Sequence, residues 1–263
     1  MKGLAKRLAL KVGLQVRRAP DPTIPFLRTI ACDGESFRFW IGNQHAKVWW
    51  DTPVLRMNAE FRSLKEMCRK GSIVLDIGAH HGMDTVLLAR WTGPAGHVYA
   101  LEANPENALV LDANIAANRL TNCTGIHTAV GATTGSLRLA DETVDERNVL
   151  ARSVPVATLD DFCSTNGLKH VDLVKIDVEG YEAHVLRGAT RVLTSRPAIA
   201  LELHLDCLAR YESSAQDVLG RIDLTGYDIR MMVRPDWETL HAFTGAADLP
   251  GAGGTVNLFF RPR

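Results

Sequence analysis

The chain has 263 residues, of which 46% are hydrophobic, and this is enough to bury a sizeable core. Thirty basic and thirty acidic residues give a formal net charge of zero. A balanced charge creates no overall field that attracts phosphate backbones, so we expect no nucleic-acid substrate.

The cysteine usage points to a reducing compartment. The five cysteines are scattered and odd in number, and no two have the C-x-x-C spacing of a zinc or redox motif. They are Cys32, Cys68, Cys123, Cys163 and Cys207. We expect core or neutral surface thiols in a cytoplasmic protein. No apolar run reaches the roughly 18 residues that a membrane-spanning helix needs.

The first 18 residues form a basic amphipathic stretch. They contain six Lys or Arg and no acid, and Leu4, Leu8 and Val12 recur at a spacing of four. We interpret the stretch as a helix with a solvated basic face, and peripheral membrane contact or organelle targeting are the alternatives. A proline-rich linker follows at 19–25. We therefore divide the chain into an N-terminal extension and cap, 1–70, and a main domain, 71–263.

The cap is predicted to contain a β-hairpin and a helix. Apolar and aromatic runs flank Gly42 and Asn43 within 36–51, the pattern of two strands joined by a tight turn. Residues 53–69 have helical character, with a proline at the start and a glycine beyond the end. The aromatic side chains of the hairpin form the cap core, a homodimer contact or a sugar-stacking platform. They are Phe37, Phe39, Trp40, Trp49 and Trp50.

From Ser72 onward, strand-like and helical segments alternate. Strands are expected at 72–77, 97–102, 123–130, 171–178 and 198–204, and helices at 83–91, 105–118, 181–193 and 213–224. This alternation indicates βαβ units and a parallel sheet, interrupted by a polar hairpin at about 135–156. The last two strands, 227–233 and 255–262, have no helix between them, so we expect an antiparallel pair at one edge.

The first strand of this series ends in the loop "DIGAHHG", at the edge where open α/β sheets bind ligands. The loop lacks the G-x-G-x-x-G of dinucleotide sites and the G-K-[ST] of phosphate loops. It resembles the D-x-G-x-x-x-G nucleoside loop of S-adenosylmethionine enzymes. By this resemblance, Gly78 and Gly82 let the backbone approach the cofactor, and Asp76 faces its ammonium group.

Two adjacent histidines stand between these glycines. Neighbouring side chains in an extended turn diverge, and no second His or Cys completes a ligand set, so we expect no metal ion on this pair. His80 is expected to line the methionine part of the cofactor, and His81 to reach the acceptor or stay solvated. Thr85 either bonds the cofactor carboxylate or caps its own helix.

The next two strands end in further candidate cofactor contacts. Glu102 ends the strand 97–102, where a carboxylate can accept the protons of both ribose hydroxyls. Such charge-assisted bonds contribute about 1.5 to 3 kcal/mol each. Thr128 and Ala129 lie near the end of the following strand, where methyltransferases place the adenine contact.

The densest group of polar side chains surrounds "KIDVEG". Lys175, Asp177 and Glu179 share one face of an extended strand because side chains alternate. Glu202 and His204 end the next strand, so ionisable groups from two strands converge on one rim. The alternative is that Asp177 or Glu179 only caps the following helix.

The segments "VLDIGAHHGMDT", "KIDVEGYEAHVLRGA" and "PAIALELH" closely resemble the FkbM family of S-adenosylmethionine-dependent methyltransferases, over about residues 71–204. The resemblance implies the α/β, Rossmann-like fold of class I methyltransferases. That fold has a seven-stranded sheet with helices on both faces and a terminal antiparallel hairpin, here behind an N-terminal cap. It also implies O-methylation of a hydroxyl on a sugar, glycan or secondary metabolite. One residue departs from the family pattern, which has Asn where this chain has His80.

Methyl transfer requires an aligned acceptor oxygen and a base for its proton. The candidates are Asp177, Glu179 and His204, and an ordinary imidazole pKa of about 6.5 makes His204 attractive. A divalent cation on Asp177, Glu202 and Asp160 is an alternative that the pattern does not favour, since Asp160 can begin a helix. The alternative function is a binding module without catalysis that docks through the N-terminal region.

Overall fold

The computed structural model describes residues 25–140, 143–144, 151–251 and 253–263. The basic stretch 1–18, with its predicted helix and membrane contact, lies outside the described residues, as does most of the linker 19–25. Among the described helices, none combines the length and apolar character that crossing a membrane requires. All five cysteines are free thiols and four of them are buried, as predicted.

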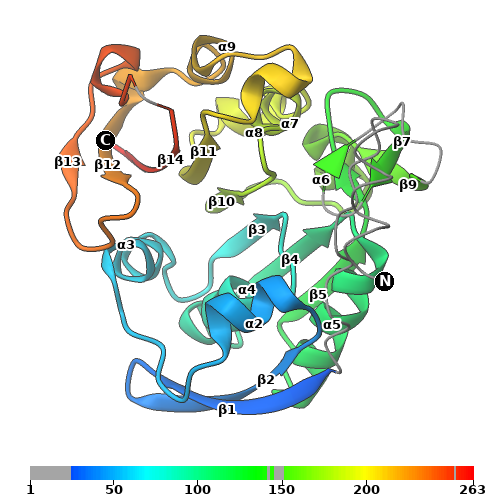
Figure 1. The fold of residues 1–263 in the computed structure, drawn as a ribbon. Helices are drawn as coiled ribbons and strands as arrows, with labels where there is room; N and C mark the ends of the chain where they lie inside the picture. The colour runs from blue at the N-terminus through cyan, green and yellow to red at the C-terminus, as the bar shows by residue number, and fades with distance from the viewer. Residues whose placement is uncertain (1–24, 141–142, 145–150, 252) are drawn as a thin grey trace, which may run out of the picture.

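A twisted sheet with the strand order β13-β12-β14-β11-β10-β3-β4-β5 forms the centre of the protein (Figure 1). Its five parallel strands are β3 (Ile73–Ile77), β4 (His97–Glu102), β5 (Cys123–His127), β10 (Leu173–Ile176) and β11 (Ala198–His204). β14 (Thr255–Pro262) lies antiparallel between β11 and β12 (Tyr227–Val233). These seven strands confirm the predicted layout, and the two-residue strand β13 (His241–Ala242) adds one more at the edge.

The strand order reverses between β3 and β10. From β3 the chain proceeds through β4 to β5 in one direction, and from β10 to β11 in the other. In open α/β sheets, such a switch point opens a crevice beyond the carboxyl ends of the strands. The fully buried β11 carries Glu202 and His204 within an otherwise apolar run, and both lie at its carboxyl end.

Helices cover both faces of the sheet, as predicted. On one face are α6 (Leu159–Thr165), α7 (Glu182–Arg187), α8 (Thr190–Thr194) and α9 (Ala215–Leu219). α4 (Met83–Thr92) covers the other face with the cap, and α5 (Pro105–Ala117) packs beside β5. The helix predicted at 181–193 is divided into two, with Gly188 between them, and only glycine fits there because a Cβ would lie 2.1 Å from the Gly131 carbonyl oxygen.

A second, four-stranded sheet lies beside the carboxyl end of β5. It has the order β6-β9-β7-β8, formed by β6 (Ala129–Val130), β7 (Gly135–Ala140), β8 (Thr143–Val144) and β9 (Arg152–Ala157). β7 and β9 are antiparallel, which confirms the polar hairpin predicted at 135–156. The single strand predicted at 123–130 is wrong, because the chain leaves the main sheet at Thr128 and β6 pairs with β9 instead.

The cap differs from its prediction. Its hairpin is formed by β1 (Phe26–Cys32) and β2 (Glu35–Ile41), joined at Asp33 and Gly34. These two residues have φ of 54° and 78°, the left-handed pair that a tight hairpin turn requires. The hairpin predicted at Gly42 and Asn43 is therefore wrong, since the Asn43 side chain caps the helix α2 (Gln44–Trp50). The next helix, α3 (Ala59–Met67), begins later than predicted because Asn58 caps it.

The cap and the main sheet share one hydrophobic core. Ile30, Phe37 and Phe39 pack in the same cluster as Val86 and Leu88 of α4. Two asparagines, one within α5 and one at its C-cap, form hydrogen bonds with the backbone of β2. Asn114 accepts from the Trp40 N–H (2.5 Å) and donates to the Trp40 carbonyl (3.1 Å) and the His81 carbonyl (2.8 Å). Asn118 makes the equivalent pair of bonds with Arg38. These amides fix β2 against α5.

Replacing Asn114 with alanine removes three hydrogen bonds at a fully buried position. The backbone groups left without partners lie away from water, so we expect the free energy of unfolding to fall by about 2 to 4 kcal/mol. Denaturant unfolding measures this loss. Asn118→Ala is the matched control at a half-buried position, where water can replace the amide and the loss should be about 1 kcal/mol. Equal losses in the two variants would contradict this account.

Candidate functional site

A cavity of about 690 Å³ lies at the carboxyl ends of β3, β4, β10 and β11, where the sheet switches direction. Residues from the cap, the second sheet and the turn after β12 complete its walls. Most of the predicted site residues line it: Gly78, His80, Glu102, Thr128, Ala129, Asp177, Glu179 and His204. The tertiary structure thus brings both predicted halves, cofactor and acceptor, into one cavity.

The loop after β3 turns sharply beneath this cavity. Gly78, His80 and Gly82 all have left-handed backbone conformations, with φ of 79°, 52° and 83°. A Cβ on Gly78 would lie 1.8 Å from the Asp177 carbonyl oxygen, so only glycine fits between the ends of β3 and β10. His80 adopts the same backbone region despite its side chain, and its N–H donates to a Glu102 oxygen at 2.7 Å.

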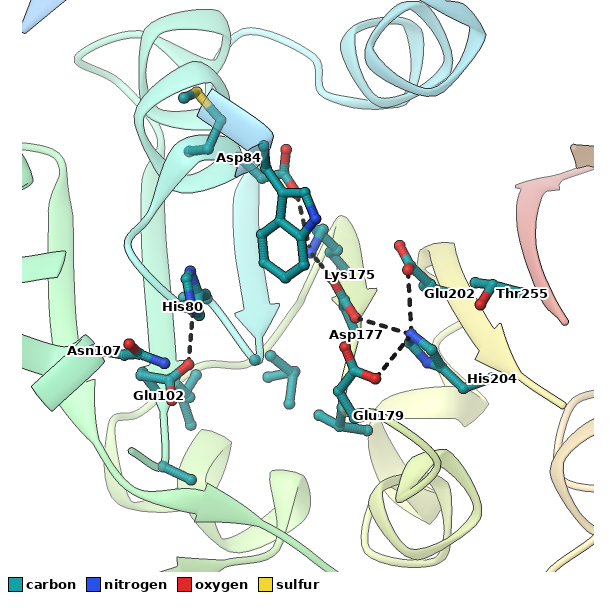
Figure 2. A pocket seen from close by; sticks show the side chains of 18 of the residues that line it. His80, Asp84, Glu102, Asn107, Lys175, Asp177, Glu179, Glu202, His204 and Thr255 are labelled. Atoms are coloured by element: carbon teal, nitrogen blue, oxygen red, sulfur yellow. Dashed lines mark hydrogen bonds and ion pairs between the residues drawn. The ribbon is translucent and has the colours of Figure 1, made fainter. Parts of the chain in front are cut away.

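Glu102 is buried at the cavity wall, beside His80 and Asn107 in Figure 2. Its two carboxylate oxygens accept the backbone N–H groups of His80 and Asn104, each at 2.7 Å. These charge-assisted bonds join the end of β4 to the loop after β3. They fix both the orientation of the carboxylate and the path of the loop.

Apolar side chains form the adjoining wall. Ala129, Leu137 and Leu139 of the second sheet pack in one cluster and line the cavity. The Thr128 hydroxyl donates to the Pro155 carbonyl at 3.1 Å, so this hydroxyl serves the local backbone. These side chains form an apolar slot next to the Glu102 carboxylate, and the second sheet is one wall of this slot.

Two predicted cofactor contacts lie outside the cavity lining. Asp76 is fully buried, accepts a hydrogen bond from the Thr85 hydroxyl at 2.6 Å, and has its pKa raised by burial. The Thr85 hydroxyl is therefore bonded to Asp76 behind the cavity wall and does not face the cavity. Gly82 shapes the loop through its left-handed backbone. The acidic group that does face the cavity from this segment is Asp84, in the first turn of α4, which the sequence analysis missed.

The two histidines of the loop stack on each other, with ring centroids 4.2 Å apart. His80 lines the cavity and also contacts the rings of Trp49 and Trp50 from the cap. His81 is buried, and its carbonyl accepts from Asn114. The expectation that His81 reaches the acceptor or stays solvated is wrong, because the cap covers it.

Lys175 is a buried cation surrounded by carboxylates. Its ammonium lies 3.0 Å from Asp84, 3.4 Å from Asp177 and 3.7 Å from Asp76. Burial lowers the pKa of an ammonium, but here the three carboxylates outweigh burial and hold the pKa of Lys175 well above its ordinary value. Lys175 therefore stabilises its acidic neighbours and does not act as a base.

His204 lies among four carboxylates, two of them buried (Figure 2). Its Nδ1 is 2.9 Å from Glu182, and its Nε2 is 3.2 Å from Glu202, 3.5 Å from Glu179 and 3.9 Å from Asp177. Burial lowers the pKa of this imidazole, but hydrogen bonds to the two buried carboxylates and the charges of the other two raise it to about 11. The expected near-neutral pKa is therefore wrong, and an imidazolium of this kind is no base at neutral pH.

Negative charge is crowded elsewhere in the same region. Burial, with the nearby charges of Asp84 and Glu202, raises the pKa of Glu60 to about 8. Arg234, from the turn after β12, lies 2.6 Å from Glu202 and offsets part of this charge. Sequence reasoning missed both Glu60 and Arg234, because neither lies in a motif or near the switch point in the chain.

Asp160 does not belong to the site. Its carboxylate accepts the backbone N–H groups of Arg191 (2.8 Å) and Val192 (3.0 Å) at the start of α8, and it lies in the first turn of α6. The predicted metal set of Asp160, Asp177 and Glu202 is therefore wrong. The described residues that could jointly hold an ion are Asp177, Glu179 and His204, with ligand atoms all within 4.8 Å of one another.

The aromatic residues of the cap divide between core and cavity. Phe37 and Phe39 are buried in the shared core, whereas Trp49 and Trp50 line the cavity. Trp237, after β12, lines it as well, and the Arg234 guanidinium lies 4.4 Å from its ring centroid. Trp49 is 51% exposed. The cavity lining therefore has aromatic surfaces as well as carboxylates.

Comparisons with solved structures reveal related folds. The FkbM methyltransferase from Methylobacillus flagellatus KT is 20% identical, with a TM-score of 0.47 over 72% of this chain and 43% of that chain. The present chain thus spans less than half the length of that protein. Trm5b from Pyrococcus abyssi is 17% identical, with a TM-score of 0.50 over 92% of this chain and 57% of that one. Identities this low show the fold alone.

A comparison with curated proteins finds no match. The family model described as "Methyltransferase FkbM domain" matches residues 76–229, which is more than half of the chain and includes both the loop after β3 and the "KIDVEG" segment. The chain therefore belongs to the FkbM family of S-adenosylmethionine-dependent methyltransferases.

Proposed function

We propose that this protein transfers a methyl group from S-adenosylmethionine to a hydroxyl of a sugar, glycan or other polyhydroxylated metabolite. One observation carries the proposal. A single cavity joins an apolar slot that ends at the Glu102 carboxylate to a half lined by Asp177 and Glu179, and tryptophan side chains line the same cavity. A nucleoside cofactor suits the first half, and a hydroxylated acceptor suits the second.

The cofactor half fits S-adenosylmethionine by the chemistry of its walls. Glu102 would bind the ribose hydroxyls, and the slot beside Ala129 and Leu137 would take the adenine ring. Asp84 and the loop after β3 would hold the amino-acid end. When bound, the cofactor supplies a methyl group already activated on a positively charged sulfur. The acidic lining of the cavity matches the positive charges on that sulfur and on the ammonium group.

Asp177 is the candidate catalytic residue for the acceptor. The contact between its carbonyl and Gly78 places it directly beside the cofactor loop. Its side chain is 29% exposed, and on the buried side its carboxylate lies 3.4 Å from the Lys175 ammonium. An acceptor hydroxyl hydrogen-bonded to this carboxylate would be aligned with the cofactor half of the cavity. Alignment of this kind can lower a barrier by about 7 to 11 kcal/mol.

The aromatic surfaces favour a sugar-like acceptor. Flat rings such as those of Trp49, Trp50 and Trp237 pack against the C–H faces of sugar rings, while carboxylates accept the hydroxyl protons. Both kinds of group line the same cavity. Their combination supports a polyhydroxylated acceptor over an apolar one.

Glu102→Ala should weaken S-adenosylmethionine binding by about 10- to 100-fold, because one charge-assisted hydrogen bond contributes about 1.5 to 3 kcal/mol. Isothermal titration calorimetry of the full chain measures this affinity. Glu106→Ala, which removes an exposed carboxylate from the first turn of α5, is the control and should bind like the wild type. Unchanged affinity in Glu102→Ala would argue strongly against the proposed cofactor site.

Asp177→Asn should lower the rate of methyl transfer by about 100-fold or more while leaving cofactor affinity near the wild-type value, since general-base contributions are of this size. Metabolite extracts incubated with enzyme and methyl-labelled cofactor, analysed by mass spectrometry, reveal the labelled product. Asp228→Asn, on the exposed side of β12, is the control. Nuclear magnetic resonance of the product then locates the methyl group. A label on nitrogen or carbon would refute O-methylation.

A further inference from the structure

We infer that Asp177, Glu179 and His204 bind one divalent cation in the acceptor half of the cavity. Their ligand atoms all lie within 4.8 Å of one another. Ligands held about 2.0 to 2.6 Å from one ion are at most about 4 to 5 Å apart, so small side-chain adjustments complete the site. Cation binding itself does not depend on the proposed function, although its catalytic role rests on it.

His204 is oriented like a metal-binding histidine. Its Nδ1 is 2.9 Å from a Glu182 oxygen, and the same oxygen accepts the Gly180 N–H at 3.0 Å. Its Nε2 lies 3.2 Å from Glu202 and also faces the carboxylates of Asp177 and Glu179 (Figure 2). In metal sites, a ligating imidazole usually gives its second nitrogen to a carboxylate, which fixes the ring and its tautomer. The Glu182–His204 pair has this arrangement.

Glu182 provides a second, independent observation. It is fully buried, and its Oε2 has no hydrogen-bond partner among the described residues. An unpaired oxygen on a buried carboxylate is costly unless positive charge lies near by. The nearby side-chain cations are already shared, since Lys175 contacts three carboxylates, Arg234 bonds Glu202 and, without an ion, the protonated His204 ring lies among all four of its acidic neighbours. A dication on Nε2 would displace the proton from that nitrogen and bring one positive charge more than the proton it replaces, which offsets part of this excess of negative charge.

An ion can reach the site from the cavity. The side chains of Asp177 and Glu179 are 29% and 44% exposed, whereas His204 forms the buried end of the set. Asp177 and Glu179 belong to the turn after β10, and His204 ends the neighbouring strand β11. Two ligands therefore come from one strand end and the third from the next.

The ligand set selects the class of metal. One imidazole nitrogen with carboxylate oxygens suits a first-row divalent ion such as Mn²⁺ better than the all-oxygen sets that Mg²⁺ and Ca²⁺ prefer. The described lining of the cavity includes no cysteine, so no thiolate is available for soft metals. We therefore assign the site to an ion of the Mn²⁺ type.

Such an ion would deepen the proposed function. In the proposed function, the Asp177 carboxylate has to accept a proton from a hydroxyl that is itself only weakly acidic. A hydroxyl bound to a divalent cation loses its proton more readily. As the acceptor oxygen bonds the methyl carbon, the bond from that carbon to sulfur breaks and its electron pair stays on sulfur. The hydroxyl proton passes to the partly exposed Asp177 carboxylate and from there to solvent.

Titrating the full chain with Mn²⁺ alone, while electron paramagnetic resonance follows the free ion, tests the site without cofactor or acceptor. We expect one Mn²⁺ per chain in the wild type. Asp177→Asn and Glu179→Gln keep the side-chain shape and should each weaken binding by about 10- to 100-fold. Asp160 was predicted as a ligand but lies outside the site. Asp160→Asn is therefore the matched control and should bind Mn²⁺ like the wild type. His204 is left unchanged because its loss would strand the buried Glu182.

Absence of saturable Mn²⁺ binding in the wild type, or wild-type affinity in both Asp177→Asn and Glu179→Gln, would overturn the site. Circular dichroism establishes that both variants are folded. A parallel titration with S-adenosylmethionine separates the two proposals. Protein that binds Mn²⁺ but no cofactor refutes the proposed function and supports the site, whereas protein that binds cofactor but no Mn²⁺ refutes the site alone.

Discussion

The close backbone contact between Gly78 and Asp177 sets the geometry of the whole site. The ends of β3 and β10 meet where the strand order reverses, and the contact is so close that a single Cβ on Gly78 would collide with the Asp177 carbonyl. The loop after β3 must therefore turn through left-handed residues, which brings the His80 N–H to Glu102. The same contact places Asp177 beside the loop after β3, so one steric constraint joins the two halves of the cavity.

Electrostatics then determines what the acidic groups can do. Lys175 and Arg234 are held by carboxylates on several sides, and His204 is bonded to Glu182 from behind. In a poorly solvated region, opposite charges attract each other more strongly than in water, whereas an excess of charge of one sign is costly. The surplus of acids around His204 therefore has a physical consequence. It suits positively charged ligands, namely a sulfonium cofactor and, by our inference, a metal ion.

The cap is part of the same structural unit in energetic terms. Phe37 and Phe39 bury their rings in the core that covers α4, and Asn114 bonds the edge of β2 as a further strand would. Because these contacts fix the hairpin, the adjoining α2 can hold Trp49 and Trp50 at the cavity wall. Packing far from the chemistry thus builds the surface that we propose recognises the acceptor.

Local patterns in the sequence determined the alternating strands and helices, the terminal antiparallel pair, the glycine turn after β3 and the acids that follow β10. Each depends on neighbours within a few residues, through side-chain alternation or left-handed φ. Tertiary structure alone decided that Asp33 and Gly34 make the hairpin turn, that Asp84 rather than Asp76 faces the cavity, and that Asp160 serves a helix. It also decided the pKa of His204, because the four carboxylates that raise it come from two segments of the chain, 177–182 and the end of β11, which are brought together only when β10 and β11 pair.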